Sequence, residues 1–428
     1  NSVINQGTIN VSNAGSVVLA SNEVINEGTI KAVKGKVHLV GADFYSLNLN
    51  GNSLVNLKID KGVLDALVKN SGHIVADGGE IYLTTNAVDE LLKGVVNNAG
   101  IIEANSVDDL FGKVELFAHG GTAEVDGTIE ALGGFVETSG DTVKIDDDFK
   151  VKADKWLIDP KDFTIASSDG DITGATLSSN LESASVEIQS VNGATDGDGD
   201  IFVNDTVSWD ASTKLTLNAS NDIFINKSIT ATTGQLSLKY GDNGDYYVNA
   251  QVNLSAGDNF FTKQTSGSET TWKVITELGN PWSNTGTDLQ GINGNLSGNY
   301  VLGGDIDASD TSAWNVGDHD NDTQSEVIAM GFDQLGDGTT TFTGNFDGLG
   351  HNVDGLYINR PTENFVGLFG YTDDGTIIKN IGVTNVDVTG KGQTGGLIGK
   401  TFYSKVKNSY STGKVVATWG YGGGLIGS

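Results

Sequence analysis

Apolar and polar residues alternate in short segments along most of this chain, and glycines separate the segments. The pattern is clear in Thr29–Ala32 and Lys36–Leu39, which are joined by a corner at Gly35. Alternation with a period of two is typical of a strand that buries one face. These segments are therefore predicted to be short strands, and His38, on the polar side of its strand, is expected to be exposed.

The strand unit repeats at a fixed spacing. Val3–Asn5 recurs as Val24–Asn26, and Ile9 recurs as Ile30, so both parts of the unit return at the same offset. A strand rises about 3.3 Å per residue and neighbouring strands lie about 4.8 Å apart, so such a circuit fits one turn of a parallel coil with two or three short strands. The asparagines of the two copies would then stack as a ladder.

The same repeat continues with small changes in spacing. Asp200–Asn204 recurs as Asp222–Asn226, one position further on than in the first repeat, and Gly367–Gly370 recurs at a longer offset as Gly396–Gly399 and Gly424–Gly427. With one circuit per repeat, the chain would hold roughly 17 circuits, or about 80 Å of rod. The pattern divides the chain into residues 1–160 with circuits of about 21–22 residues, 161–288 with an irregular aromatic stretch, and 289–428 with circuits of about 28–29 residues.

Two places interrupt the alternation with helical spacing. Val88, Leu91, Leu92 and Val95 stand at i, i+3, i+4 and i+7, which predicts a short helix from about Ala87 to Val95. Leu64, Leu67 and Val68 hint at another helical turn. Both are expected to be packed side excursions from the coil.

Composition excludes several classes of partner. The chain of 428 residues has 25 basic and 55 acidic residues and a formal net charge of −30. A polyanion argues against nucleic acid and anionic membranes as partners. The charge fits either a soluble exported protein or a cation-binding role. The chain has no cysteine and no apolar run near the ~20 residues that a membrane-spanning helix needs. It begins and stops inside a repeat, so it is expected to be a fragment.

Several stretches resemble the large exoproteins of two-partner secretion, the group of filamentous haemagglutinin and the high-molecular-weight adhesins. They are Asp65–Gly72, Leu91–Gly100, Gly134–Gly140 and Lys155–Pro160. The Gly-Leu-Phe-Gly and Gly-Leu-Ile-Gly repeats, with their lead-in at Leu296–Leu302 and Phe346–His351, resemble the GLUG motif. The resemblance covers about residues 1–240 and 289–428.

The resemblance implies an all-β fold, a right-handed parallel β-helix, and export through an outer-membrane pore partner. It also implies a role as an adhesin or matrix scaffold on the bacterial surface. The secretion domain of that family starts with an Asn-Pro-Asn-Gly-like element, and no Asn-Pro occurs near this amino terminus. Only the later part of the domain is therefore expected here.

Two acidic runs have carboxylates at every second residue, a spacing that can converge on Ca²⁺. The candidate ligands are Asp196, Asp198, Asp200, Asp318, Asp320 and Asp322. The alternative for each run is a solvated turn, because neither has the downstream glutamate of a twelve-residue calcium loop. Calcium is the one cofactor that the sequence allows for.

Aromatic residues near the carboxy terminus are candidates for a sugar-stacking platform. They are Trp272, Trp282, Trp314, Trp419 and Tyr421, and the alternative is that they cap circuits of the coil. The single arginine, Arg360, stands next to Pro361 in a predicted loop with no evident acidic cluster, and the sequence contains no Gly-x-Ser-x-Gly elbow. We therefore predict no enzymatic activity.

Together these observations predict a segment of a secreted, surface-associated adhesin or extracellular matrix fibre. A rigid rod would present binding surfaces to a host or bacterial glycan or protein. The alternative function is a polysaccharide-binding or polysaccharide-degrading β-helix module. A passive spacer, with the receptor site elsewhere, is a third possibility.

Overall fold

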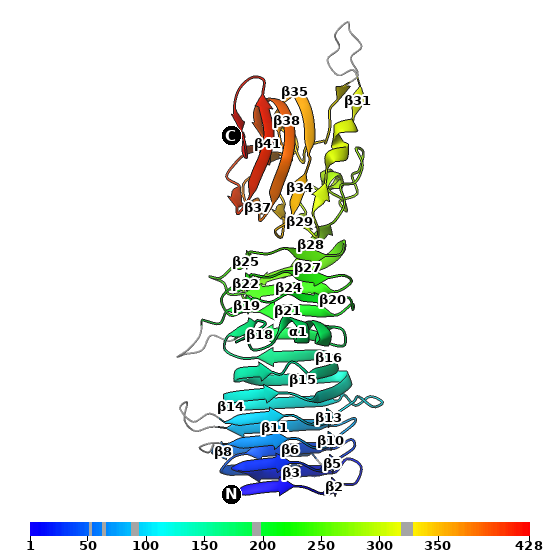
Figure 1. The fold of residues 1–428 in the computed structure, drawn as a ribbon, viewed down its shortest axis with the longest axis vertical. Coiled ribbons are helices and arrows are strands. Elements are labelled where there is room, and N and C mark those ends of the chain that lie inside the picture. The colour runs from blue at the N-terminus through cyan, green and yellow to red at the C-terminus, as the bar shows by residue number, and fades with distance from the viewer. Residues whose placement is uncertain (51–53, 62–65, 87–93, 191–197, 318–327) are drawn as a thin grey trace. The chain divides into compact units, whose positions relative to one another are not determined.

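A computed structural model describes residues 1–428 except 51–53, 62–65, 87–93, 191–197 and 318–327. The described chain is mostly β, and its strands pair mainly in parallel (Figure 1). It divides into two compact units. Unit 1 comprises Asn1–Lys227, Thr233–Tyr247 and Lys263–Ser268, and unit 2 comprises Ser228–Thr232, Val248–Thr262 and Glu269–Ser428.

Strands in unit 1 form three parallel stacks, because the chain returns to each stack once per circuit (Figure 1). The first holds β1 (Ser2–Asn5), β4 (Glu23–Asn26), β9 (Leu67–Asn70), β12 (Val95–Asn98) and the end of β14 (Lys113–Val125). The second holds β2 (Thr8–Asn10), β5 (Thr29–Lys31), β10 (His73–Val75), β13 (Ile101–Glu103), and the starts of β15 (Thr128–Ile145) and β16 (Lys150–Asp159). The third holds β3 (Ser16–Ser21), β6 (Lys36–Gly41), β11 (Glu80–Asn86), parts of β14–β16, β18 (Ser185–Gln189), β21 (Lys214–Asn218) and β24 (Gln235–Tyr240).

The register of these stacks confirms the repeat read from the sequence. Val3 pairs with Val24, and Ile9 pairs with Ile30, so the predicted offset is one circuit. Ile30 pairs in turn with Ile74, and both side chains are fully buried. The corner glycines are needed where circuits touch: a Cβ on Gly35 would lie 1.9 Å from the Gly15 carbonyl oxygen. Apolar side chains therefore stack on like side chains through the interior of the unit.

An asparagine ladder closes one corner of the first stack. Each Nδ2 donates to the Oδ1 of the next asparagine, from Asn5 to Asn26 at 2.7 Å, from Asn26 to Asn70 at 2.8 Å and from Asn70 to Asn98 at 2.8 Å. Asn98 ends the ladder by donating to the backbone oxygen of Asp126 at 2.9 Å. The predicted stack of Asn5 on Asn26 is confirmed, and it extends over two more circuits. Asn26, Asn70 and Asn98 are fully buried, which the continuous pairing makes possible.

Other elements of unit 1 lie between or beside the stacks. They are the antiparallel hairpin of β7 (Phe44–Asn50) and β8 (Leu54–Lys61), a further parallel stack of β17 (Phe163–Ile165), β19 (Ile201–Val203) and β22 (Ile223–Ile225), then β20 (Val207–Trp209), β25 (Tyr246–Val248) and helix α1 (Gly174–Leu181). Ile201 pairs with Ile223, as the second repeat predicts. Neither the hairpin nor α1 is predicted by the alternation.

The two helical turns read from the sequence fare differently. Residues 87–93 of the predicted helix Ala87–Val95 lie outside the described residues, and Val95 begins strand β12. The turn predicted at Leu67 and Val68 is wrong, because both residues belong to β9. Pairing of β9 with β4 on one side and β12 on the other satisfies its backbone, and this outweighs the local spacing of leucines.

The expectation that His38 is exposed is wrong. His38 is 7% exposed, and its ring stacks on the ring of Tyr82 one circuit later, at 4.9 Å and an interplanar angle of 5°. Nε2 of His38 has no hydrogen-bond partner. Burial, with a smaller contribution from Lys36, lowers the pKa of His38 from 6.5 to about 4, against the opposing effect of Glu80. The imidazole is therefore neutral in the folded protein at pH 7.

This shift predicts a loss of stability in mild acid. The unfolded chain binds the His38 proton below its ordinary pKa of 6.5, and the folded chain only near pH 4. The free energy of unfolding should therefore fall as the pH falls between these values, by up to about 3 kcal/mol. His38→Phe keeps the stack without a titrating group. Urea unfolding at pH 7 and pH 4.5 should show a smaller acid loss for this variant than for the natural chain, and equal losses would contradict the argument.

Asp159, the last residue of β16, is expected to destabilise the fold at neutral pH. Its Oδ1 is buried without a partner, and burial, with Glu137 and Glu187 nearby, raises its pKa from 3.8 to about 6. Because the folded state binds this proton more tightly, stability is lost as the pH rises through that interval. Asp159→Asn should therefore stabilise unit 1 at pH 7 by about 1 kcal/mol, after allowance for solvent screening. The gain should vanish at pH 3.5 in the same unfolding assay.

Unit 2 is also built from parallel stacks. One holds β28 (Thr270–Ile275), β29 (Asn299–Leu302), β33 (Asn345–Asp347), β37 (Ile377–Lys379) and β40 (Lys405–Lys407). Another holds β30 (Ile306–Asp307), β34 (Asn352–Asp354), β35 (Tyr357–Val366), β38 (Gly382–Gly395), β41 (Tyr410–Ala417) and β42 (Gly422–Gly423). Smaller pairs are β23 (Ile229–Ala231) with β26 (Val252–Leu254), β36 (Phe369–Thr372) with β39 (Ile398–Thr401), antiparallel β31 (Val316–Gly317) with β32 (Ile328–Ala329), and antiparallel β27 (Gly257–Gln264) with β28.

The longer repeat is confirmed in unit 2. Phe369 pairs with Ile398, and Ile398 with Ile426, as the spacing of the Gly-Leu-Phe-Gly and Gly-Leu-Ile-Gly segments predicts. The core is rich in aromatic rings, with Phe346 and Phe369 at 5.3 Å in an edge-to-face contact. Two 3-10 helices, η1 (Gln290–Gly294) and η2 (Ser309–Ala313), lie beside the strands.

The predicted boundary after residue 160 coincides with the end of a strand. β16 ends at Asp159, directly before Pro160, and its second half still pairs in parallel with β18. The irregular aromatic stretch, from about residue 241 to 282, is where the chain passes between unit 1 and unit 2. The boundaries at 160 and 288 themselves stay predictions.

Candidate binding site around Arg360

The only arginine of the chain lies in strand β35 of unit 2, beside a bulge. Arg360 pairs with Gly390 of β38, and the register then shifts before Asn364. Pro361 sits in this irregular segment, where a residue without an N–H is tolerated. The bulge brings Glu363 back over Arg360, so that Nη1 donates to Oε1 of Glu363 at 3.0 Å. Arg360 is therefore part of a strand and not of the predicted loop.

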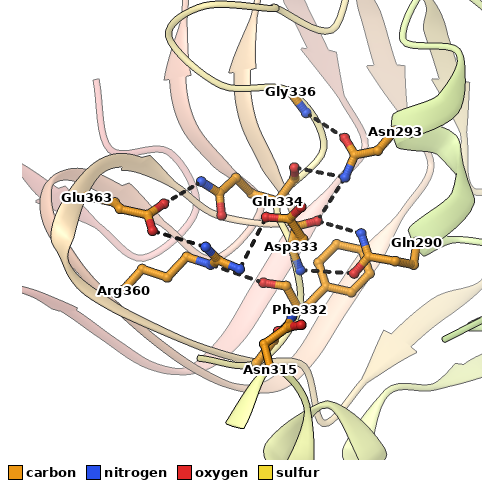
Figure 2. A network of polar contacts seen from close by, with 10 residues as sticks. Gln290, Asn293, Asn315, Phe332, Asp333, Gln334, Gly336, Arg360 and Glu363 are labelled. Atoms are coloured by element: carbon orange, nitrogen blue, oxygen red, sulfur yellow. Dashed lines mark hydrogen bonds and ion pairs between the residues drawn. The ribbon is translucent and has the colours of Figure 1, made fainter. Parts of the chain in front are cut away.

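A cluster of acceptors surrounds the guanidinium group (Figure 2). Nη2 of Arg360 lies 3.1 Å from Oδ1 of Asp333, and Nε donates to the backbone oxygen of Phe332 at 3.4 Å. Arg360 is 8% exposed, so these contacts replace much of its hydration. The expectation that Arg360 has no acidic cluster is wrong. The carboxylates come from another circuit and from beyond the bulge, and linear sequence does not bring them together.

Two amide side chains of η1 hold the segment that carries Asp333. Gln290 both donates to the backbone oxygen of Asp333 at 2.8 Å and accepts from its backbone N–H at 2.9 Å. Asn293 donates to the backbone oxygens of Asp333 and Gln334, both at 3.2 Å, and accepts from the N–H of Gly336 at 3.1 Å. Figure 2 shows both amides reaching this segment from the same helical turn. The backbone under the cluster is thus fixed before any ligand binds.

Gln334 links the cluster to Glu363 and leaves one acceptor unused. Its Nε2 donates to Oε2 of Glu363 at 3.2 Å, so Arg360 and Gln334 hold the two carboxylate oxygens of Glu363. Gln334 is 7% exposed, and its buried Oε1 has no hydrogen-bond partner. An unsatisfied buried acceptor costs about 1–3 kcal/mol, so this arrangement is not optimised for stability alone.

The cluster forms one side of a groove of about 650 Å³. Its other walls include the turn at Asp337, whose Oδ1 accepts from the backbone N–H groups of Thr339 and Thr340 at 2.7 and 2.8 Å. Phe365 supplies an apolar wall and lies against Gly338, where a Cβ would come within 2.7 Å of its ring. The φ angle of Phe365 is +63°, a conformation that bulky residues rarely adopt and that the fold imposes here.

The groove is acidic despite the arginine. Burial raises the pKa of Asp333 above its ordinary value, Arg360 lowers it, and Glu363 and Asp337 raise it further. About half of the Asp333 side chain is exposed, at 55%, so it remains accessible from the groove. A carboxyl with a raised pKa in a groove is typical of functional sites, although structural ion pairs produce the same effect.

The predicted calcium ligands are only partly described. Asp196, Asp318, Asp320 and Asp322 lie outside the described residues. Asp198 is exposed, and Oδ1 of Asp200 accepts from Nδ2 of Asn221 at 2.9 Å and from the backbone N–H of Asp222 at 3.0 Å. Within the part of the chain that the structure describes, no group of three or more His, Asp or Glu side chains could hold a metal ion.

Asp200 belongs to a ladder of aspartates that the sequence analysis missed. Asp162 accepts from the N–H of Asp200 at 3.1 Å, Asp200 from that of Asp222, and Asp222 from that of Asp245 at 2.7 Å. Each aspartate stands directly before a strand, at the corner where a circuit turns. The repeated Asp-Ile-Phe at two of these positions was the available signal.

The candidate aromatic platform is divided in the structure. Trp272 is 8% exposed, and its Nε1 donates to Oγ1 of Thr262 at 2.8 Å; Trp314 packs against the core beside Phe332. Neither ring offers an open face to a sugar. The exposed members are Trp282, Trp419 and Tyr421, and the ammonium of Lys391 lies 5.9 Å from the centre of the Trp419 ring.

Comparison with known proteins gives partial similarities. No family model matches the chain. A region of 149 residues, 33% of this chain, is 36% identical to Halomucin of Haloquadratum walsbyi, and the match spans 2% of that protein. A region of 62 residues, 14% of this chain, is 32% identical to a putative Gly-rich membrane protein of Evansella cellulosilytica, over 7% of its length. Among the described residues no helix is both long and apolar enough to span a membrane.

Proposed function

We propose that this chain is a segment of a secreted adhesin or extracellular matrix fibre of a bacterial surface, built as a right-handed parallel β-helix. The observation that carries the proposal is the in-register parallel stacking of like residues, from the asparagine ladder of unit 1 to the paired Gly-Leu-Phe-Gly repeats of unit 2. A chain that stacks on itself in this way needs no disulfides to become rigid. Rigidity suits a protein that must hold binding surfaces away from a cell.

Charge and resemblance support an extracellular place. A net charge of −30 keeps a long, glycine-rich chain soluble and disfavours anionic partners. The resemblance to two-partner secretion exoproteins adds an outer-membrane pore as the export partner. The partial similarity to Halomucin, a protein far longer than this chain, fits a segment of a large repetitive protein.

Adhesion assays test the proposal directly. The chain is immobilised on beads, and binding to cells and to a panel of purified glycans and surface proteins is measured with and without calcium. Saturable binding supports the adhesin. Small-angle X-ray scattering on the same sample tests the predicted rod, since the maximum dimension should grow by about 4.8 Å for each circuit added. No binding to any surface would favour a passive spacer.

A polysaccharide-degrading module is the second candidate, and the Arg360 cluster favours it. A basic side chain between two carboxylates, one with a raised pKa, is an arrangement that acid–base cleavage can use. Release of reducing ends or of unsaturated products from a polysaccharide panel would support cleavage, provided that Asp333→Asn abolishes it. Binding without turnover supports the adhesin.

A further inference from the structure

We propose that the groove beside Arg360 binds one neutral saccharide unit of a glycan. The inference depends on the proposed binding role and is independent of the export route and of the β-helical rod. It identifies a site that lies apart from the aromatic residues predicted from the sequence.

Hydrogen-bond acceptors dominate the groove. Asp333, Asp337 and Glu363 contribute carboxylates, and Asn364 adds an exposed amide. Carboxylates accept and do not donate, and most donors of Arg360 already point to protein oxygens. A complementary ligand must therefore supply several hydrogen-bond donors, as the hydroxyl groups of a sugar do.

Charge argues that this ligand is neutral. An anionic sugar would meet three carboxylates and the net charge of −30. A cationic ligand would have to compete with the buried guanidinium of Arg360, which already pairs with Asp333 and Glu363. It would also approach Lys400, whose ammonium lies 5.2 Å from the centre of the Phe365 ring. Hydroxyl donors without charge avoid both penalties.

The unused oxygen of Gln334 is a second and independent sign of a ligand. Gln334 lines the groove, is 7% exposed and leaves Oε1 without a donor while Nε2 holds Glu363. Rotation about its last side-chain torsion would let a ligand hydroxyl donate to Oε1 and take over the bond to Glu363. The amides of Gln290 and Asn293 keep the backbone beneath in place during that exchange.

Phe365 provides the apolar contact that sugar recognition requires. Its half-buried ring forms a wall of the groove opposite polar groups, so that the C–H face of a pyranose can lie on it while the hydroxyls face the acceptors. Gly338 leaves space for the ring, and a side chain at that position would push into it. Polar groups on one wall and an aromatic ring on another are typical of a small, oriented ligand site.

Titration calorimetry on the full chain tests the inference. The probes are neutral gluco-, galacto- and manno-oligosaccharides, with an oligogalacturonate and a chitosan oligomer as charged comparisons. Binding of at least one neutral oligosaccharide is expected, weakened at least tenfold by Glu363→Gln and at least threefold by Asn364→Ala. Asn364 is exposed, so its variant tests the groove even if Glu363→Gln disturbs folding. Glu269→Gln, an exposed change of the same kind in unit 2, should leave the affinity unchanged.

Two results would overturn the inference. One is neutral-sugar binding that neither groove variant weakens, and the other is binding of the charged oligomers alone. In both cases the chain still binds a glycan, and the proposed adhesin role stands. If the chain adheres to no cell, glycan or surface protein, the proposed function itself fails together with the inference.

Discussion

Replacing Ile30 by aspartate is expected to lower the free energy of unfolding of unit 1 by at least about 4 kcal/mol. Ile30 is fully buried and pairs in register with Ile9 on one side and Ile74 on the other. A carboxylate there would meet only apolar neighbours, without a donor or a cation. It would either remain charged at a high desolvation cost or take up a proton and leave a polar group unpaired.

The adjacent substitution Lys31→Asp is the matched control. Lys31 is exposed and follows Ile30 in the same strand, so the same carboxylate would face solvent. We expect a change below about 0.5 kcal/mol. Hydrogen exchange measured by mass spectrometry reports unit 1 peptides separately from those of unit 2. Similar loss of protection in the two variants would mean that the assigned inward and outward faces are incorrect.

Asn70→Asp is expected to cost unit 1 about 3 kcal/mol at pH 7. The change keeps the shape of the side chain and its ability to accept from Asn26, but it removes the donor to Oδ1 of Asn98. At this fully buried position a charged carboxylate would also face that oxygen directly. A protonated aspartate can again donate, so the penalty should shrink as the pH falls toward 4.

Asn10→Asp makes the same chemical change at an exposed position. Asn10 ends strand β2 beside Lys31, where an added negative charge should be neutral or slightly favourable. Urea unfolding of both variants at pH 7 and pH 4.5 separates the ladder from a general effect of charge. An equal cost at both values of pH would indicate that the ladder contributes shape and not hydrogen bonds.

Much of the strand architecture can be read from the chain, because the fold repeats. In a parallel stack each residue lies beside its counterpart one circuit later, so an offset in the sequence is also a contact in space. The pairs Ile9 with Ile30 and Phe369 with Ile398 are predicted on this basis and are confirmed. The stacking of Asn5 on Asn26 follows from the same rule.

Elements that depart from the repeat cannot be predicted in this way. The hairpin β7–β8 and helix α1 are inserted between circuits, and no register relation predicts them. The helical turn predicted at Leu67 is wrong because a spacing of three or four residues carries no information about what lies above and below. The alternation places His38 on the surface because it does not show that Tyr82 covers its ring.

The candidate site depended most on tertiary structure. One feature of it was visible in the sequence: a chain that otherwise uses lysine keeps one arginine, the residue suited to pairing with two carboxylates at once. Its partners Asp333 and Glu363, and the clamp at Gln290, come from different circuits and from a bulge.

The sequence alone determined the alternation of buried and exposed residues, the length of a circuit and the residues that stack, since all three are set by local periodicity. Only the tertiary structure decided which polar groups meet around Arg360 and which titratable groups lose their water. Those properties depend on distances between circuits and on how a bulge redirects one side chain, and neither is encoded in spacing along the chain.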